Sequence, residues 1–250
     1  MVLVNVNHKG GVGKTTNTIH IGAELNNRGK KVLLIDADNQ CDLTAGVGIE
    51  DTGYSIVDFL QKKDNLNFGA IKENFHLLQG NPNFSSAKFN RMELKKSIEA
   101  FGIDAFYDYI LIDVPPTGVN PDYTSPAELA LCSTHWVIIP LNADMFSIKN
   151  VNNFVGKILE LRKYNPDLKL LGLYFSNVLT TTNVFWDYYK ILQEEQAQSM
   201  FKTYIRRDIE IVKASIEGKT IFEYNEKSRG AEDFRSFVSE IEAKITQNNA

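Results

Sequence analysis

The sequence predicts an α/β fold, in which a doubly wound, mostly parallel sheet is flanked by helices. Short apolar runs rich in valine and isoleucine alternate with longer segments of helical periodicity. The first of these runs leads through a glycine-rich turn into a helical segment, and a second run closes a β–α–β unit. The runs are continuously apolar, as strands covered on both faces are. Strands that alternate with helices form parallel sheets with helices on both sides.

The expected elements follow one another in chain order. After Lys14 the apolar positions fall on one helical face, and Gly29 ends this first helix. Strands are expected at residues 2–6, 32–35, 77–78, 109–112, 136–139 and 170–175. Further helical stretches are expected near residues 86–100, 147–164 and 184–198. Because crossovers between parallel strands are right-handed, the strand ends that carry polar residues should meet along one edge of the sheet.

The composition limits the class of protein. The chain has 250 residues, of which 43% are hydrophobic, and we expect residues 1–250 to form one domain. It contains no run of about 18 apolar residues that would span a membrane, and its start lacks the features of a signal peptide. Cys41 and Cys132 form no C-x-x-C pair, which indicates a reducing compartment rather than a disulfide framework or a zinc site. We therefore expect a cytoplasmic protein.

The C-terminal segment has the pattern of an amphipathic helix. Its apolar residues repeat at helical spacing: Phe234, Phe237, Val238, Ile241 and Ile245. Such a helix either packs on the core or lies on a membrane surface. The polar face carries several acidic residues, whereas a membrane-surface helix favours lysine and arginine. We therefore expect the helix to pack against the core.

A glycine-rich segment lies between the first strand and the first helix. It consists of Lys9, Gly10, Gly11, Val12, Gly13, Lys14, Thr15 and Thr16. In this context glycines let backbone N–H groups converge on phosphate oxygens, and the helix adds its positive N-terminal end. Lys14 is expected to neutralise the β- and γ-phosphates, Thr15 to bind Mg²⁺, and Thr16 to hold an α-phosphate oxygen. The sequence therefore predicts a P-loop for a nucleoside triphosphate with Mg²⁺.

This loop resembles the deviant Walker A motif of the family that contains ParA, MinD and the nitrogenase iron protein. Lys9 stands directly before the glycine pair, and His8 takes the place of the first glycine of the general P-loop pattern. In that family the additional lysine reaches the nucleotide phosphates of a partner subunit. The resemblance thus implies an ATPase in which Lys9 and Lys14 take part in catalysis and ATP stabilises a homodimer. A solvated loop lysine is the plainer interpretation of Lys9.

Three carboxylates follow the second strand. Asp36, Asp38 and Gln40 match the family's Asp-x-Asp-x-Gln motif. The resemblance implies that Asp38 holds the water that attacks the γ-phosphate. It also implies that Asp36 supports the loop near Mg²⁺ and that Asp42 contacts the metal from switch I, and carboxylates suit this hard cation. An ordinary acidic loop is the alternative, above all for Asp42.

The strand at 109–112 ends in Asp113, which gives a Walker B pattern. Four apolar residues place this carboxylate at the edge of the sheet, where we expect it to orient a Mg²⁺-bound water. Residues 115–118 (Pro-Pro-Thr-Gly) resemble the family's switch II. An apolar strand that ends in aspartate is weak evidence for a Walker B motif on its own. The P-loop upstream makes the assignment of Asp113 specific.

Two residues further along the chain are candidates for contacts with the base. Asn177 follows the strand at 170–175, and an asparagine amide can pair with the N6 and N7 edge of adenine. Relatives place an asparagine at this position, although a turn-forming asparagine is the alternative. Asp208 matches a second position of the family's base pocket, where Arg206 replaces a usual proline.

The resemblance covers nearly the entire chain and is to small ParA/Soj-type partition ATPases. Because the P-loop begins near the N-terminus, we expect no helix-turn-helix domain before it. The resemblance implies an ATP-driven dimer that binds DNA without sequence preference and segregates or positions plasmid or chromosomal cargo on the nucleoid. It further implies a ParB-like or adaptor protein that stimulates hydrolysis, and no membrane partner.

DNA affinity of this kind would come from phosphate contacts. The net charge is −4, so binding would need a local basic patch. The candidate patch consists of Lys202, Arg206, Arg207, Lys213 and Lys219. Glu210 lies within it, where some DNA-binding relatives carry a basic residue. A solvated face of mixed charge is the alternative.

Other functions are compatible with the same switch. A ParA-like ATPase can position a protein complex or an organelle instead of DNA, and a MinD-like ATPase acts at a membrane, which the acidic final helix disfavours. An electron-transfer protein like the nitrogenase iron protein needs a pair of cysteines at the dimer axis, and Cys41 lies in the switch I loop instead. A metabolic kinase would need a substrate pocket that the sequence does not reveal.

Overall fold

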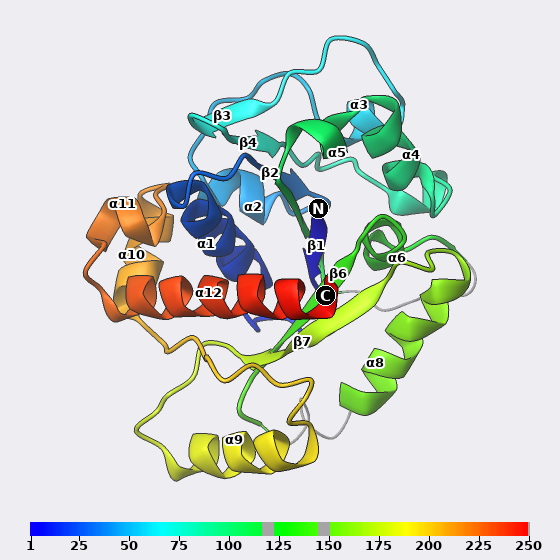
Figure 1. Ribbon diagram of the computed structural model, residues 1–250. Coiled ribbons are helices and arrows are strands. Elements are labelled where there is room, and N and C mark those ends of the chain that lie inside the picture. The colour runs from blue at the N-terminus through cyan, green and yellow to red at the C-terminus, as the bar shows by residue number, and fades with distance from the viewer. Residues whose placement is uncertain (117–122, 145–150, 250) are drawn as a thin grey trace.

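The computed structural model describes residues 1–116, 123–144 and 151–249 (Figure 1). At its centre is a seven-stranded sheet with the order β3-β4-β2-β5-β1-β6-β7. Neighbouring strands are parallel except for the antiparallel pair β3 and β4. Helices lie on both sides of the sheet, so the predicted α/β class is confirmed.

All six predicted strands are present in the sheet. They are β1 (Val2–Asn5), β2 (Val32–Asp36), β4 (Phe75–Leu78), β5 (Tyr109–Asp113), β6 (Trp136–Leu141) and β7 (Lys169–Phe175). The additional strand β3 (Gly69–Lys72) lies at the edge and is partly exposed. Because an edge strand of four residues needs no continuous apolar run, its sequence carries no strong strand signal.

The strands separate two hydrophobic cores. Successive side chains of a strand point to opposite faces, so Val2 and Val4 join one buried cluster while Leu3 joins the other. The first cluster is covered by α3 (Ile56–Leu60), α4 (Glu93–Ala100), α5 (Ile103–Phe106), α6 (Pro126–Leu131), α8 (Val151–Leu159) and α9 (Asn183–Glu195). The second is covered by α1 (Lys14–Asn27), α2 (Asp42–Gly46), α10 (Ile209–Ile216), α11 (Ile221–Asn225) and α12 (Arg229–Asn249).

Two helical stretches differ in detail from the prediction. The stretch expected at 86–100 is divided into a 3₁₀ turn, η1 (Ser86–Lys88), and α4. Between them the Asn90 side chain accepts a hydrogen bond from the Met92 backbone N–H (2.9 Å), a local turn that competes with helix. The stretch expected at 147–164 appears as α8 and a 3₁₀ turn, η2 (Glu160–Lys163), and its start lies outside the described residues.

The final helix packs on the core, as predicted. The side chains of Phe234, Phe237 and Ile241 in α12 are fully buried. Arg28, just after α1, ties the polar side of α12 by donating to the Glu242 carboxylate (2.8 Å) and to the Arg235 carbonyl (2.7 Å). Within the described part of the chain, no helix is both long and apolar enough to cross a membrane.

The carboxyl ends of the central strands meet at one edge of the sheet. In the register of the sheet, Asn5 of β1 and Asp36 of β2 both pair with Asp113 of β5. Open α/β sheets bind their ligands at this edge. The polar residues that the sequence places after separate strands are thus brought side by side.

Candidate nucleotide-binding site

The loop between β1 and α1 turns through two glycines. Gly11 (φ 72°) and Gly13 (φ 82°) lie in the left-handed region, which residues with side chains rarely adopt. A Cβ atom at Gly13 would also lie only 3.0 Å from the Ser176 hydroxyl oxygen. Val12 between them is fully buried and anchors the loop, whereas the exposed Gly10 leaves its backbone accessible. The loop has the open glycine backbone that phosphate binding requires.

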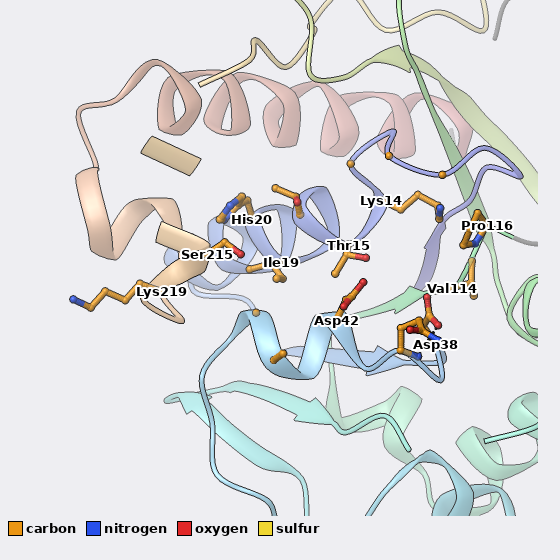
Figure 2. Close-up of a pocket in the computed structure, with 17 residues that line it drawn as sticks. Lys14, Thr15, Ile19, His20, Asp38, Asp42, Val114, Pro116, Ser215 and Lys219 are labelled. Atoms are coloured by element: carbon orange, nitrogen blue, oxygen red, sulfur yellow. Dashed lines mark hydrogen bonds between the residues drawn. The ribbon is translucent and has the colours of Figure 1, made fainter. Parts of the chain in front are cut away.

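Two cavities meet at this loop. The larger, of about 650 Å³, is lined by the loop, the start of α1, Asp38, Asp42 and Pro116, and it extends to Ser215 in α10. Figure 2 shows Lys14 at one end of this cavity and Asp42 pointing from α2 toward Thr15. The smaller, of about 390 Å³, is lined by Asn177 and residues 205–209 among others. Both cavities include Gly11, Gly13 and Thr16, so they meet at one loop, with the residues expected to contact phosphate lining the larger and those expected to contact the base lining the smaller.

Lys14 is the first residue of α1 and only 7% exposed. Burial lowers the pKa of Lys14, while the Asp113 and Asp38 carboxylates act in the opposite direction. Its ammonium lies 3.5 Å from the Lys9 carbonyl oxygen, a long contact that leaves its hydrogen-bonding capacity largely unused. A largely buried cation at a helix N-terminus that lines a cavity is suited to a phosphate anion.

Thr15 and Asp113 face each other beneath the loop. The Thr15 hydroxyl donates to one Asp113 carboxylate oxygen at 2.6 Å. The other oxygen is buried and has no hydrogen-bond partner among the described residues. Burial raises the pKa of Asp113 to about 8. A buried carboxylate oxygen without a partner, beside a threonine hydroxyl, fits a divalent cation with oxygen ligands.

Asp113 should make the stability of the nucleotide-free protein depend on pH. With its pKa raised to about 8, the folded protein keeps a proton that the unfolded chain has lost above about pH 4. The contribution of this group to the free energy of unfolding therefore falls as the pH rises toward 8, by up to about 1.4 kcal/mol per pH unit. Asp113→Asn should remove this dependence, so the variant gains stability relative to wild type between about pH 5 and about pH 8. Urea unfolding across this range measures it, and a constant difference would contradict it.

The carboxylates after β2 have different surroundings. Both oxygens of the fully buried Asp36 accept hydrogen bonds, from the Asp38 N–H (3.1 Å) and from the backbone and hydroxyl of Thr44 (2.9 and 2.7 Å). Asp38 accepts from the Gln40 N–H (2.9 Å) and lines the larger cavity, as does the exposed Asp42. The Asp36 carboxylate oxygens are therefore used to hold the loop that carries Asp38.

The described residues contain no group of three His, Cys, Asp or Glu side chains that could hold a metal ion. In proteins, Mg²⁺ keeps several waters and is usually held by one or two carboxylates together with substrate phosphates. Thr15 and Asp113 form the pair in direct contact. Asp42 approaches Thr15 from the other side of the cavity (Figure 2).

Lys9 is paired within its own chain. Its ammonium forms a salt bridge of 2.5 Å with the Asp144 carboxylate, which lies just after β6. The two side chains are 35% and 33% exposed. The Lys9 backbone N–H donates to the Asn7 side chain (2.9 Å), whose amide in turn donates to the Pro140 carbonyl (2.7 Å). The base of the lysine is therefore fixed, while its charged end lies in a partly solvated ion pair.

The smaller cavity brings the two predicted base-pocket residues together. Asn177 is exposed and adopts a left-handed conformation (φ 55°) directly after β7. Asp208 is the N-cap of α10: one carboxylate oxygen accepts from the Glu210 N–H (3.0 Å) and the other from the Gly230 N–H (2.9 Å). Both residues line the cavity, but Asp208 also orders the starts of two helices.

The candidate basic patch is largely neutralised by neighbouring carboxylates. Arg206 pairs with Asp233 and Glu232, and its hydrogen bonds to Asp233 above all raise its pKa above the usual range of arginine, although burial acts in the opposite direction. Lys213 pairs with Glu210 and Lys219 with Glu217, each at 2.8 Å. Figure 2 also shows Lys219 pointing away from the phosphate loop.

Lys202 and Arg207 differ from the other members of this patch. Both are exposed, and neither forms an ion pair with any residue that the structure describes. The exposed side of α10 between the paired cations is apolar and carries Ile209, Val212 and Ile216. The structure thus leaves Arg207 and Lys202 as the cations most available to an anionic partner.

The sequence analysis missed some residues that shape the site. Asp144 lies just beyond the carboxyl end of β6, near the edge at which β5 ends in Asp113, so the rule that ligands bind at the carboxyl edge of the sheet could have identified it. Asn17 and Tyr174 are buried beneath the loop, and nothing in the sequence pattern predicted their contact. The periodicity of a helix or strand shows which residues are buried, but it does not show which polar residues of separate elements meet. The predicted switch II residues Thr117 and Gly118 lie outside the described residues.

The fold and the loop define a P-loop nucleotide-binding protein. A parallel sheet with a strand–glycine loop–helix unit and an acidic residue on a neighbouring strand is characteristic of this class.

Comparison with known proteins gives the family. A family model described as an AAA domain matches residues 1–170. The chromosome-partitioning ATPase Soj of Thermus thermophilus is 30% identical over 96% of this chain and 95% of its own length. A solved structure named cobyrinic acid a,c-diamide synthase of Mycobacterium smegmatis, with ADP and magnesium, is 27% identical with a TM-score of 0.77 and covers 95% and 92% of the two chains. The cell division ATPase MinD of Pyrococcus furiosus shares the fold, with a TM-score of 0.78 at 24% identity over 97% and 98% of the two chains. The chain belongs to the ParA/MinD family of P-loop ATPases.

Proposed function

We propose that the chain is a single-domain, Mg²⁺-dependent ATPase switch of the ParA type, which dimerises with ATP and binds DNA without sequence preference to segregate or position plasmid or chromosomal cargo. The observation that supports it best is the arrangement at the phosphate loop. Lys14, Thr15 and the partly unpartnered Asp113 converge there, and a second lysine, Lys9, stands ahead of the loop. The likeness to a protein named chromosome-partitioning ATPase Soj supports the assignment to partition.

The phosphate side of the site performs the hydrolysis. Backbone N–H groups of Gly10 to Thr16 cradle the phosphates, and Lys14 neutralises the charge that develops on them. Thr15 and Asp113 would hold Mg²⁺, with Asp42 approaching from switch I and Asp36 supporting the loop between them. When bound, Mg²⁺ would supply positive charge that offsets the charge of the phosphates. Asp38 positions the attacking water, since its carboxylate is at the cavity wall and fixed by the Gln40 N–H.

Dimerisation requires Lys9 to leave Asp144. A partly exposed ion pair contributes about 1 kcal/mol or less, so a triphosphate presented by a second copy can displace it. The same lysine then contacts phosphate across the interface, and ATP and the dimer stabilise each other. We propose that a ParB-like or adaptor protein stimulates hydrolysis and resets this state, and that the protein acts in the cytoplasm on the nucleoid.

DNA binding is the part of the proposal that an experiment should test first. With ATP, the Asp38→Ala variant should be retained on random DNA, and retention should fall steeply with salt because it rests on phosphate contacts. Arg207→Ala should lower affinity and reduce the salt slope by about 1. Lys213→Ala is the matched control with a smaller effect, because Glu210 already neutralises that lysine. Retention that is independent of ATP, or unchanged in Arg207→Ala, would refute DNA binding at this surface.

A protein cargo is the second candidate. The apolar side chains of Ile209 (62% exposed), Val212 (53%) and Ile216 (81%) lie on one side of α10, and such surfaces are more typical of protein contacts than of DNA contacts. If the ATP-bound dimer is not retained on DNA, a ParA-like role in positioning a protein complex is favoured.

A further inference from the structure

We propose that a buried hydrogen-bond network of Asn5, Asn17, Tyr174 and Ser176 presets the phosphate loop and couples it to the edge that contacts the base. Asn17 and Tyr174 are positioning residues in this network, since they do not line the phosphate side of the site. The inference rests on the proposed nucleotide site, but it requires neither DNA binding nor dimerisation.

The network joins three elements beneath the loop. The Asn17 amide of α1 donates to the Tyr174 hydroxyl and to the Ser176 hydroxyl, both at 2.8 Å. The Tyr174 hydroxyl of β7 donates to the Asn5 side-chain oxygen (3.2 Å), and the Asn5 amide donates to the Lys14 carbonyl (3.1 Å). None of the four side chains belongs to a residue more than 1% exposed. The chain of bonds therefore runs from Ser176, just after β7, to Lys14 at the end of the loop.

The network also fixes the shape of the loop by contact. The Asn17 backbone N–H donates to the Gly13 carbonyl (2.8 Å), and the space of a Cβ at Gly13 is taken by the Ser176 hydroxyl at 3.0 Å. The Asn17 amide nitrogen lies 3.4 Å from the same position. Gly13 is therefore held against Asn17 and Ser176, in the left-handed conformation that starts α1.

The four side chains of the network are polar although they are buried, which indicates a function beyond packing. Asparagine is a weak helix former and a buried amide is costly unless satisfied, so an apolar residue would serve a purely structural position in α1 better. In the described part of the chain, the fully buried side-chain atoms without partners are on Ser97 and Asp113, so no fully buried polar atom of the network lacks a partner. Satisfied buried networks are rigid and specify one arrangement.

The base side of the site is connected to this arrangement. Ser176 directly precedes Asn177, whose left-handed backbone (φ 55°) turns its side chain at the end of β7. Asn17, Ser176 and Asn177 all line the smaller cavity together with Gly13. A loop and a strand end that are held in place before binding lose less conformational freedom when phosphates and base are bound together.

Tyr174→Phe tests the network with little change in packing. The ring packs against Phe237 in a tilted arrangement with centroids 4.3 Å apart, and phenylalanine keeps this contact while it removes the hydroxyl. We expect ADP affinity, measured calorimetrically with Mg²⁺, to fall about fivefold to tenfold, because the two hydrogen bonds of the hydroxyl, with Asn17 and with Asn5, are lost. Tyr107→Phe is the matched control: it removes a buried hydroxyl bonded to His76 (3.1 Å), far along the chain from the loop, and should leave ADP affinity unchanged.

A second measurement separates coupling from simple destabilisation. If the network links the base edge to the loop, Asn177→Ala should weaken ADP binding less in the Tyr174→Phe protein than in wild type, by at least about threefold. Ser176→Ala provides an independent variant of the same network if Tyr174→Phe does not fold. ADP affinities that are unchanged in the folded network variants, or that fall equally in Tyr107→Phe, overturn the proposal. A wild-type protein that binds no ADP would instead remove the nucleotide site itself.

Discussion

Replacing Lys14 by alanine is expected to abolish measurable nucleotide binding, with a loss of ADP affinity of about 100-fold or more. Lys14 is 7% exposed, at the first position of α1, and faces the larger cavity together with the glycine loop. The carboxylates of Asp113 and Asp38 stand nearby. Without the ammonium, phosphate would lose its nearest cation among the acidic side chains of the site, so the substitution removes the main attraction.

Calorimetric titration with ADP and Mg²⁺ measures this effect. Lys30→Ala is a suitable control, because Lys30 follows α1 at its other end and is not part of the cavity lining. The folded state should survive, since Lys14→Ala removes a partly desolvated charge and keeps a good helix former at the start of α1. An affinity within about threefold of wild type would show that the phosphates bind elsewhere.

The elements that the sequence predicted well are those whose signal is local. β1 and β5 are continuous apolar runs, and each ends in a polar residue, Asn5 or Asp113, at the functional edge. Their burial on both faces makes the run visible without knowledge of the neighbours. β3 was missed for the opposite reason, since a partly exposed edge strand is defined by its partner β4 and not by its own composition.

The same distinction holds within the site. The glycines of the loop and Asp113 could be predicted because phosphate chemistry demands these residue types at fixed spacing. The pairing of Lys9 with Asp144 joins residues 135 positions apart, and Asn17 meets Tyr174 across 157 positions. Such contacts depend on how the sheet is assembled, which periodicity does not encode.

The candidate DNA patch shows where counting charges fails. Five cations lie close in sequence, but Lys213 has a partner three residues away and Arg206 has partners in α12. A lysine paired with a glutamate on its own helix contributes little to a phosphate-binding surface. Arg207 differs from these neutralised neighbours only in its spatial surroundings, which the sequence does not reveal.

Replacing Lys9 should have the other large effect, on assembly rather than on binding. In the Asp38→Ala protein, which is expected to bind ATP without hydrolysing it, ATP should convert the monomer to a dimer, whereas ADP should not. Lys9→Ala in that background should remain monomeric with ATP at concentrations where the parent is fully dimeric. ADP affinity should change little, since the Lys9 ammonium points to Asp144 and not into the cavity of its own subunit.

Light scattering after size exclusion, with ATP or ADP and Mg²⁺, measures the mass directly. Asp144→Asn is the informative companion variant, because it removes the partner that holds the Lys9 ammonium at 2.5 Å in the single chain. If this ion pair competes with the partner's triphosphate, its loss should lower the ATP concentration needed for dimerisation by up to about fivefold, the equivalent of about 1 kcal/mol. Lys9→Ala should prevent ATP-dependent dimerisation, whereas Asp144→Asn should make it easier. These opposite effects would distinguish competition for Lys9 from a general loss of structure. A dimer that forms equally well without Lys9 would leave an ordinary P-loop ATPase in which this lysine is only a surface residue.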